Sequence, residues 1–204
     1  MLLYLCGDFM NQYFDNNENL ESNIVENKVK VLDTEFYMYT DNGVFNKKGL
    51  DFGTRVLLEN IDIDNKYSFL DVGCGCGPIG FYILLNRPDT VVDMIDVNNR
   101  AIKLTKMGLK KNHISGEVFN SDAYSNVEGK YDMIITNPPI HVGKEKVYEI
   151  IRGAKEHLNA NGELWIVIRK DQGAKSLIND NSDYYDFEIV NRIKGFWIIK
   201  SRIK

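Results

Sequence analysis

The sequence predicts an α/β fold: a doubly wound, mostly parallel seven-stranded sheet that ends in an antiparallel hairpin, with a small N-terminal β-hairpin extension. Apolar runs of strand length alternate with segments of helical periodicity, and this alternation implies right-handed crossovers between parallel strands. A glycine-rich turn follows the first of these runs, as at the ligand-binding edge of such sheets. The last two runs, 185–191 and 195–201, are joined by only a few residues, which can connect only antiparallel neighbours.

The N-terminal residues predict a lead-in to a single domain. Residues 10–27 are rich in Asn, Asp and Glu, and residues 1–27 are expected to form a flexible lead-in. We hypothesise that translation starts at Met10, so that residues 1–9 do not belong to the native chain. Residues 28–204 are then expected to form one domain that begins with the hairpin.

Periodicity places the remaining elements in order. The hairpin region is expected at 28–49, and Pro78 suits the first turn of the helix that follows the glycine turn. Helices are expected at 50–60, 78–86, 98–111, 144–158 and 172–179. Strands besides the final pair are expected at 28–32, 35–40, 67–72, 90–95, 116–120, 131–136 and 162–169.

The composition is that of one globular domain. At 204 residues, 44% of them hydrophobic, the chain can bury one full core. A net charge of −4 argues against a protein that coats nucleic acid through bulk charge. The three cysteines form neither a disulfide framework nor a zinc-ligand pattern, which fits a reducing compartment, and no metal is expected. No stretch approaches the ~20 apolar residues of a membrane span, so we expect a cytoplasmic protein without a membrane partner.

The glycine-rich turn at residues 71–77 predicts a nucleoside cofactor. Its glycines let the backbone approach a ligand at the carboxyl end of a strand. Asp96, about 20 residues further on, ends the next predicted strand, where an acid can bind a ribose. This leaves both a nicotinamide dinucleotide and S-adenosylmethionine open. Asp71 favours the latter because a carboxylate can face its ammonium group.

The turn Asn137-Pro138-Pro139-Ile140 follows the apolar run 131–136 and predicts the chemistry. Prolines fix the backbone and donate no N–H, so the Asn amide and the carbonyls remain as acceptors for an amine. If the Asn137 side-chain oxygen and the Pro138 carbonyl each accept one N–H, the lone pair of a planar nucleobase amine turns toward an electrophile. Hydride transfer needs no such turn. These four residues are the expected catalytic residues.

Several segments resemble class I S-adenosylmethionine-dependent methyltransferases: DVGCGCGPIG, VDMIDVNNRAI, SDAY and YDMIITNPPIHVGK. Together with TDNGVFNKKGLDFGTRVLLE, they resemble the small-domain group that includes ribosomal RNA guanine-N2 methyltransferases of the small subunit, over roughly residues 28–201. The resemblance implies a Rossmann-like methyltransferase fold, with S-adenosylmethionine as cofactor and S-adenosylhomocysteine as product. Many larger members carry two such domains, one of them involved in substrate recognition, and this sequence shows one.

The resemblance also implies cofactor contacts. Gly73, Gly75 and Gly77 would line the methionine part of the cofactor, and Asp71 would reach its ammonium group directly or through water. The full set of expected cofactor-binding residues is Asp71, Gly73, Cys74, Gly75, Gly77, Asp96, Val97, Asp122, Ala123 and Asn137.

At the nucleoside end, Asp96 would accept the ribose hydroxyls and Val97 would pack on adenine. Asp122 and Ala123 would meet the adenine edge, and Thr54 would help to close the pocket with Phe45.

The residue after Asn-Pro-Pro bears on the acceptor. In adenine and glutamine methyltransferases of the wider superfamily this residue is usually aromatic, whereas Ile140 offers apolar packing without directed stacking and favours guanine. Phe45, Phe52 or Tyr124 could supply a ring instead. Substrate contacts are expected from Phe45, His141 in a positioning role, and Lys144 near phosphate.

The expected function is methyl transfer from S-adenosylmethionine to the exocyclic amine of a guanine in ribosomal RNA. The partner would be ribosomal RNA or the small ribosomal subunit, and the protein a monomer or weak homodimer. Three alternatives remain open at this point. They are a protein-glutamine or nucleic-acid adenine methyltransferase, a non-catalytic RNA-binding assembly factor that retains the fold, and a nicotinamide oxidoreductase.

Overall fold

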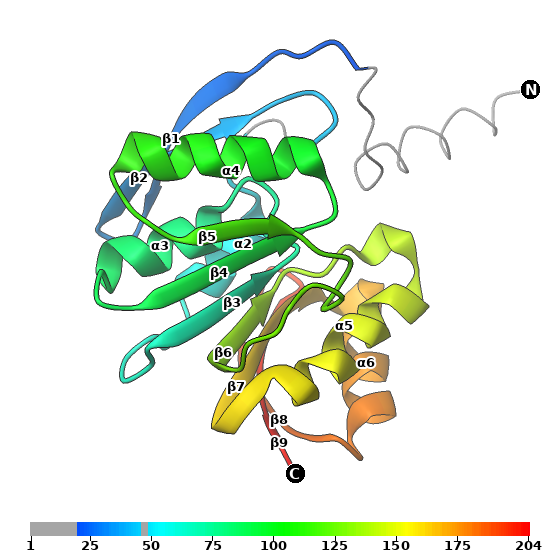
Figure 1. The fold of residues 1–204 in the computed structure, drawn as a ribbon. Helices are drawn as coiled ribbons and strands as arrows, with labels where there is room; N and C mark the ends of the chain where they lie inside the picture. The colour runs from blue at the N-terminus through cyan, green and yellow to red at the C-terminus, as the bar shows by residue number, and fades with distance from the viewer. Residues whose placement is uncertain (1–19, 46–48) are drawn as a thin grey trace, which may run out of the picture.

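The computed structural model describes residues 20–45 and 49–204, and its main feature is a seven-stranded sheet (Figure 1). The strands are β3 (Ser68–Val72), β4 (Val91–Asp96), β5 (Glu117–Asn120), β6 (Tyr131–Thr136), β7 (Leu158–Arg169), β8 (Tyr185–Ile193) and β9 (Phe196–Ile203). They lie in the order β5-β4-β3-β6-β7-β9-β8. Strands from β5 to β7 pair in parallel, whereas β9 pairs antiparallel with β7 and β8. The predicted fold class is confirmed.

Helices cover both faces of the sheet. They are α2 (Phe52–Leu58), α3 (Pro78–Asn86), α4 (Asn99–Asn112), α5 (Lys144–His157) and α6 (Ala174–Asn181), with short 3-10 helices η1 (Ile140–Val142) and η2 (Lys170–Gln172). Side chains of Asp51 and Asn98 accept N–H bonds in the first turns of α2 and α4, and Pro78 opens α3. In the part of the chain that the structure describes, no helix is long and apolar enough to cross a membrane.

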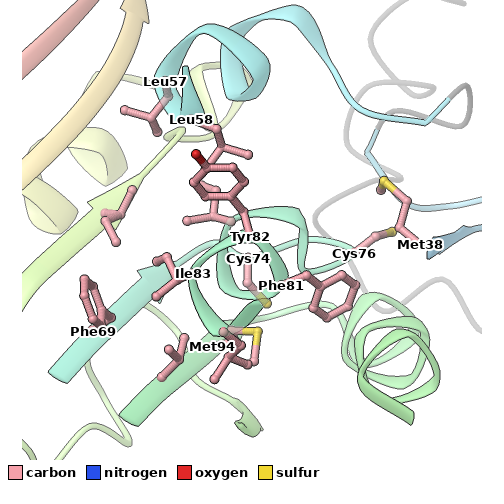
Figure 2. Packing of buried hydrophobic residues seen from close by; sticks show 14 of the residues in the cluster. Met38, Leu57, Leu58, Phe69, Cys74, Cys76, Phe81, Tyr82, Ile83 and Met94 are labelled. Atoms are coloured by element: carbon pink, nitrogen blue, oxygen red, sulfur yellow. The ribbon is translucent and has the colours of Figure 1, made fainter. Parts of the chain in front are cut away.

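Two apolar clusters, one on each face, form the core. Side chains from α2, α3 and α4 pack on one face, and side chains from α5 and α6 pack on the other. In the first cluster, Figure 2 shows the thiols of Cys74 and Cys76 pointing into the apolar interior rather than outward. Burial raises the pKa of Cys76 to about 12, so this thiol stays protonated. The glycine turn is thereby fixed to the core beneath it.

The N-terminal hairpin packs against α4 and α3, two of the helices that cover the first of these faces. Its strands are β1 (Val25–Val31) and β2 (Thr34–Thr40), and Asn112 at the end of α4 binds both the N–H and the carbonyl of Tyr37. The first strand begins at residue 25, three residues earlier than the expected boundary at 28.

The lead-in is also more ordered than expected where it is described. The Asp41 carboxylate accepts bonds from the Ser22 hydroxyl at 2.7 Å and the Asn23 N–H at 2.5 Å, and Arg100 binds the Leu20 carbonyl at 2.8 Å. The prediction that the flexible lead-in extends to residue 27 is therefore wrong for residues 20–27. The predicted flexibility of residues 1–19 and the hypothesis about residues 1–9 concern positions outside the described residues.

Several element boundaries differ from the expectation in the second half of the chain, and α6, for example, spans Ala174–Asn181 rather than 172–179. Strand β7 begins at Leu158 rather than at 162, because Leu158 already pairs with Tyr131 of β6. An irregularity in the register follows, and Asn161 adopts a left-handed conformation there (φ 65°). The turn between β8 and β9 consists of Lys194 and Gly195, both with positive φ (47° and 85°), as in the tight turns that suit the twist of a hairpin.

Candidate active site

A cavity of about 870 Å³ opens at the carboxyl edge of the parallel strands. Strands β3 and β6 are neighbours there, and the helices that follow them lie on opposite faces, which is where open α/β sheets bind their ligands. One wall, which we call the glycine wall, comes from the glycine turn and from the ends of β4 and β5. The other, the aromatic wall, comes from residues 137–142 and from Phe52, Arg169, Gln172 and Phe196. Asn137 begins the second of these walls.

The glycine wall is shaped by hydrogen bonds to the end of β4. The N–H groups of Gly73 and Cys74 both donate to the Ile95 carbonyl at 2.9 Å, and the Gly75 N–H donates to the Asp96 carboxylate at 2.8 Å. Gly73 and Gly75 have positive φ, and a Cβ on either would meet no atom within 4 Å. Both glycines therefore leave open surface toward the cavity, where a ligand can approach the backbone.

Gly77 has a different role from the expected one. It does not line the cavity, and a Cβ there would lie 2.6 Å from Thr105 Cγ2 and 2.7 Å from the Phe81 ring. Its φ of +82° and this close packing show that Gly77 serves the turn and the core rather than the ligand.

Asp96 lies at the end of β4 with its carboxylate at the cavity wall. One oxygen accepts the Gly75 N–H and the other accepts the Asn98 N–H, each at 2.8 Å. Burial raises the pKa of Asp96 against the lowering effect of these backbone donors. Val97, Asp122 and Ala123 also line this wall, as expected. The free lone pairs of the Asp96 carboxylate could accept ribose hydroxyls.

Asp71 is placed differently from the expectation. Its side chain is buried and does not line the cavity, and neither carboxylate oxygen has a hydrogen-bond partner among the described residues. Burial, reinforced by the nearby charge of Asp96, raises the pKa of Asp71 to about 8. Direct contact with a ligand in the cavity is therefore not the observed arrangement, and contact through water stays a prediction.

Asn137 is held by two acceptors that the sequence did not single out together. Its Nδ2 donates to Thr54 Oγ1 at 3.0 Å and to Asp51 Oδ1 at 3.2 Å. The same Asp51 oxygen accepts the Thr54 N–H at 2.9 Å and caps α2. A carboxylate can only accept, so the amide nitrogen must face Asp51, and the Asn137 side-chain oxygen has no partner among the described residues.

The backbone around Asn137 is also fixed. Thr136 Oγ1 donates to the Val72 carbonyl at 2.9 Å and joins the ends of β6 and β3 directly below the two turns. Pro138, Pro139 and Ile140 line the cavity beyond Asn137, and the chain then enters η1. The expected catalytic turn thus lies at the cavity, with a rigid base and an oriented amide.

Some of the residues expected to contact the substrate line the cavity, and others do not. Phe45 and His141 line the cavity and are exposed. Lys144 does not line it, because its ammonium group pairs with Asp180 at 2.8 Å and lies over the Tyr148 ring. Tyr124 is likewise turned away, since its hydroxyl donates to the Ile150 carbonyl and its ring stacks on His157. The expected phosphate role of Lys144 and the ring from Tyr124 find no support in this arrangement.

Arg169, Gln172 and Phe196 are among the cavity residues that the sequence analysis did not single out. Phe196 begins β9, and because β9 is antiparallel to β7, its first residue pairs with Arg169 at the carboxyl edge. The predicted antiparallel hairpin at the end of the chain already implied this position, because an antiparallel last strand begins at the carboxyl edge of the sheet. No group of three or more potential metal ligands occurs within residues 20–45 and 49–204.

Comparison with known proteins identifies the family. The model of the methyltransferase small domain matches residues 35–200 of the chain. The uncharacterized protein YbxB of Bacillus subtilis (strain 168) is 38% identical over 195 residues, which cover 93% of this chain and 97% of that protein. The chain belongs to the methyltransferase small domain family. It is therefore an S-adenosylmethionine-dependent methyltransferase.

A further relative and a protein of similar fold are both larger than this methyltransferase. The ribosomal RNA small subunit methyltransferase C of Haemophilus influenzae (strain PittGG) is 43% identical over 134 residues, 64% of this chain and 41% of that protein. A T. thermophilus 16S rRNA N2 methyltransferase, solved in complex with AdoMet and guanosine, superposes with a TM-score of 0.78 at 20% identity, over 91% of this chain and 52% of that one. The chain thus spans about half or less of the length of these two proteins.

The residues of the glycine wall fit the cofactor of the family. Gly73 and Gly75 present open backbone that any Cβ would obstruct, and the Asp96 carboxylate offers acceptors for a ribose. The cavity volume of about 870 Å³ lies within the range of small-molecule sites, ~300–1,000 Å³. Gly73, Gly75, Asp96, Val97, Asp122 and Ala123 are the residues that would hold S-adenosylmethionine.

Proposed function

We propose that this methyltransferase transfers a methyl group from S-adenosylmethionine to the exocyclic amine of a guanine in ribosomal RNA of the small subunit. The observation that carries the proposal is the orientation of the Asn137 amide, whose nitrogen is engaged by Asp51 and Thr54 so that its oxygen is left as an acceptor at the cavity. The names of relatives that act on small-subunit ribosomal RNA support the substrate class.

The chemistry requires the acceptor amine to be activated. S-adenosylmethionine, when bound, supplies an electrophilic methyl group on a sulfonium. The exocyclic amine of guanine is weakly nucleophilic because its lone pair is delocalised into the ring. The Asn137 oxygen and the Pro138 carbonyl would each accept one N–H of this amine and stabilise the positive charge that develops on nitrogen. The proton can then leave to solvent, so no strong base is needed among the residues of the turn.

The identity of the base rests more on the relatives than on Ile140. An aliphatic residue at this position favours guanine only if no other ring can stack on the substrate. Phe52 and Phe196 line the same cavity, with ring centroids 5.6 Å apart, so a stacking surface is present without a ring at position 140. Adenine or a protein glutamine therefore belongs in the substrate panel.

The test is a methyl-transfer panel with labelled S-adenosylmethionine. Purified small subunits, large subunits, free ribosomal RNA, DNA and protein substrates are incubated with the native enzyme, and labelled RNA is digested to nucleosides. We expect label in small-subunit RNA as N2-methylguanosine. Label confined to protein or DNA, or recovered as a methylated adenosine, would overturn the proposal.

A variant at the turn tests the mechanism within that panel. Asn137→Ala removes the oriented acceptor, and by analogy with loss of one oxyanion-hole donor we expect kcat to fall roughly 100- to 1,000-fold. Affinity for S-adenosylmethionine should stay within about twofold in calorimetry, since the glycine wall is untouched. The matched control is Asn179→Ala on the exposed side of α6, which should leave both quantities unchanged. Normal turnover by Asn137→Ala would contradict the mechanism.

The partner that follows from the proposal is ribosomal RNA or the small ribosomal subunit, in the cytoplasm. A monomer or weak homodimer stays a prediction for this methyltransferase. Sedimentation of the purified chain over a range of concentrations measures the association directly.

A further inference from the structure

A cation-aromatic stack lines the same cavity as Asn137, at residues to which the sequence analysis assigned no joint role. Arg169 ends β7, and its guanidinium lies 5.6 Å from the centroid of the Phe196 ring. Phe196 in turn meets Phe52 edge-on, at 5.6 Å between centroids. We call Arg169, Phe196 and Phe52 the mouth platform. All three residues line the cavity that contains Asn137.

The plane of the Arg169 guanidinium is fixed. Its Nε and Nη2 donate to the two carboxylate oxygens of Asp171 at 2.9 and 2.8 Å, in the forked geometry typical of arginine with carboxylate. The guanidinium carbon lies over the Phe196 ring, and 46% of the Arg169 side chain remains exposed. A planar cation that is held in this way offers a flat, half-open surface, and nucleobases stack on such surfaces in proteins that bind single strands.

The backbone that carries the platform is rigid. Cα pairing places Arg169 opposite Phe196 in the sheet, and the Lys170 N–H donates to the Gly195 carbonyl at 2.8 Å. Helix α2 packs tightly against the Phe196 ring of β9 at Gly53, where a Cβ would lie only 2.8 Å from the ring. The platform is therefore formed before a ligand arrives, which limits the entropy lost on binding.

Charge at this edge suits a nucleic acid strand. The ammonium group of Lys194 lies 5.3 Å from the Phe52 ring centroid, and Lys170 and Lys194 are exposed without an ion pair among the described residues. The net charge of −4 does not attract phosphate, so local cations must do so. Two unpaired lysines next to a stacking surface supply that attraction at the cavity mouth.

From these features, which rest on the proposed RNA substrate, we infer that the mouth platform binds the nucleotide adjacent to the target guanine in a single-stranded segment of RNA. The target base must reach Asn137 inside the cavity. The half-exposed Arg169 lies at its mouth, where the next base of the strand would arrive. The base stacks on the guanidinium of Arg169, which Phe196 supports from below, and the lysines contact the phosphates. The enzyme would thus require a short unpaired segment rather than an isolated guanine.

The test compares a variant that removes the positive charge of Arg169 with one that keeps the charge and removes only the planar guanidinium. Binding is followed by fluorescence anisotropy with an end-labelled RNA heptamer that carries one central guanine among uridines, with S-adenosylhomocysteine present. Base stacking is worth ~1–3 kcal/mol per base by alanine substitution, so we expect the Kd of the heptamer to rise about fivefold or more in both Arg169→Gln and Arg169→Lys. Phe196→Leu should weaken binding by a similar factor.

The matched control is Arg192→Gln. Arg192, in β8, lies over Trp197, whose side chain packs in the cluster on the other face of the sheet, and its replacement removes one positive charge from the same sheet. We expect less than a twofold change in heptamer affinity for Arg192→Gln, and unchanged affinity for S-adenosylhomocysteine in this control and in the Arg169 variants. The affinity of guanosine monophosphate, measured as a competitor, should not change in the Arg169 variants.

Three results would overturn the inference. Arg169→Lys could bind the heptamer as the native protein does, Arg192→Gln could weaken binding as much as Arg169→Gln, or the native protein could fail to bind the heptamer. Because the assay measures binding and not methyl transfer, its outcome is separate from that of the substrate panel. A native enzyme that methylates adenine would refute the proposed function and still leave the platform testable.

Discussion

The two acceptors that hold the Asn137 amide give a direct measure of how much its orientation matters. Thr54→Val preserves the shape of a buried side chain and removes one acceptor from Asn137 Nδ2. A neutral side-chain hydrogen bond contributes ~0.5–1.5 kcal/mol. If all of that is used to orient the amide, kcat should fall about 2- to 10-fold, since ~1.4 kcal/mol corresponds to a factor of ten.

Asp51→Ser removes the other acceptor. Serine can still cap α2, but its shorter side chain does not extend to Asn137. Hydrogen bonds to charged groups contribute ~1.5–3 kcal/mol, and the 3.2 Å length of this one places it near the lower value. We therefore expect kcat to fall about 10-fold.

The assay is single-turnover methyl transfer to the substrate that the panel identifies, together with calorimetric affinity for S-adenosylmethionine. Thr54→Ser retains the hydroxyl and should restore most of the rate lost in Thr54→Val. If Asp51 and Thr54 act through Asn137, adding either change to Asn137→Ala should cause no further loss of kcat. Losses that multiply in the double variants, or a drop in cofactor affinity as large as the drop in rate, would refute this positioning role.

Two further predictions concern the glycine wall. The pKa of Asp71 is raised to about 8 from an ordinary value of 3.8. Between these two pH values the unfolded chain therefore binds fewer protons than the folded chain. The free energy of unfolding of the ligand-free protein falls as pH rises from 3.8 to about 8. Asp71→Asn removes this contribution, and its stability relative to the native protein, from urea unfolding, should increase between pH 5 and pH 8; a constant difference would contradict it. Gly75→Ala should weaken S-adenosylmethionine binding at least about tenfold with a modest loss of stability, because the new Cβ enters open cavity space at a φ of +54°. Gly77→Ala should lose more stability, an additional ~1–3 kcal/mol, because its Cβ collides with Thr105 and Phe81; equal melting temperatures for the two variants would show that these roles are wrongly divided.

Local patterns predicted the parts of the site that follow directly from a strand end. The glycine turn, Asp96 and Asn137 each come at the carboxyl end of a parallel strand, and the topology brings such ends to one edge. Residues whose contribution depends on packing between distant segments were harder to predict from the sequence. Asp51 reaches Asn137 across 86 positions of sequence, and whether it faces the cavity depends on how α2 docks on the sheet.

The errors have the same physical origin. Gly77 and Asp71 belong to the expected motif, but the alternation of side chains along β3 and the tight packing of Phe81 turn them to the core. Lys144 was expected near phosphate, and the acidic side chain of Asp180 on α6 holds it elsewhere. Spacing in the sequence fixes which backbone atoms come to the edge, whereas the direction of each side chain is decided by neighbours that the spacing does not reveal.

The bond from Thr136 to the Val72 carbonyl has a consequence for how the two reactants meet. The strands that lead to the donor turn and to the acceptor turn are adjacent, and Asp71 pairs with Ile135 one residue before this crosslink. The separation between the methyl donor and the amine is therefore set by the hydrogen bonds of a folded sheet and not by the closing of a loop. The methyl-donor site and the amine site are aligned once, when the protein folds, and each new substrate meets two sites whose separation is already fixed.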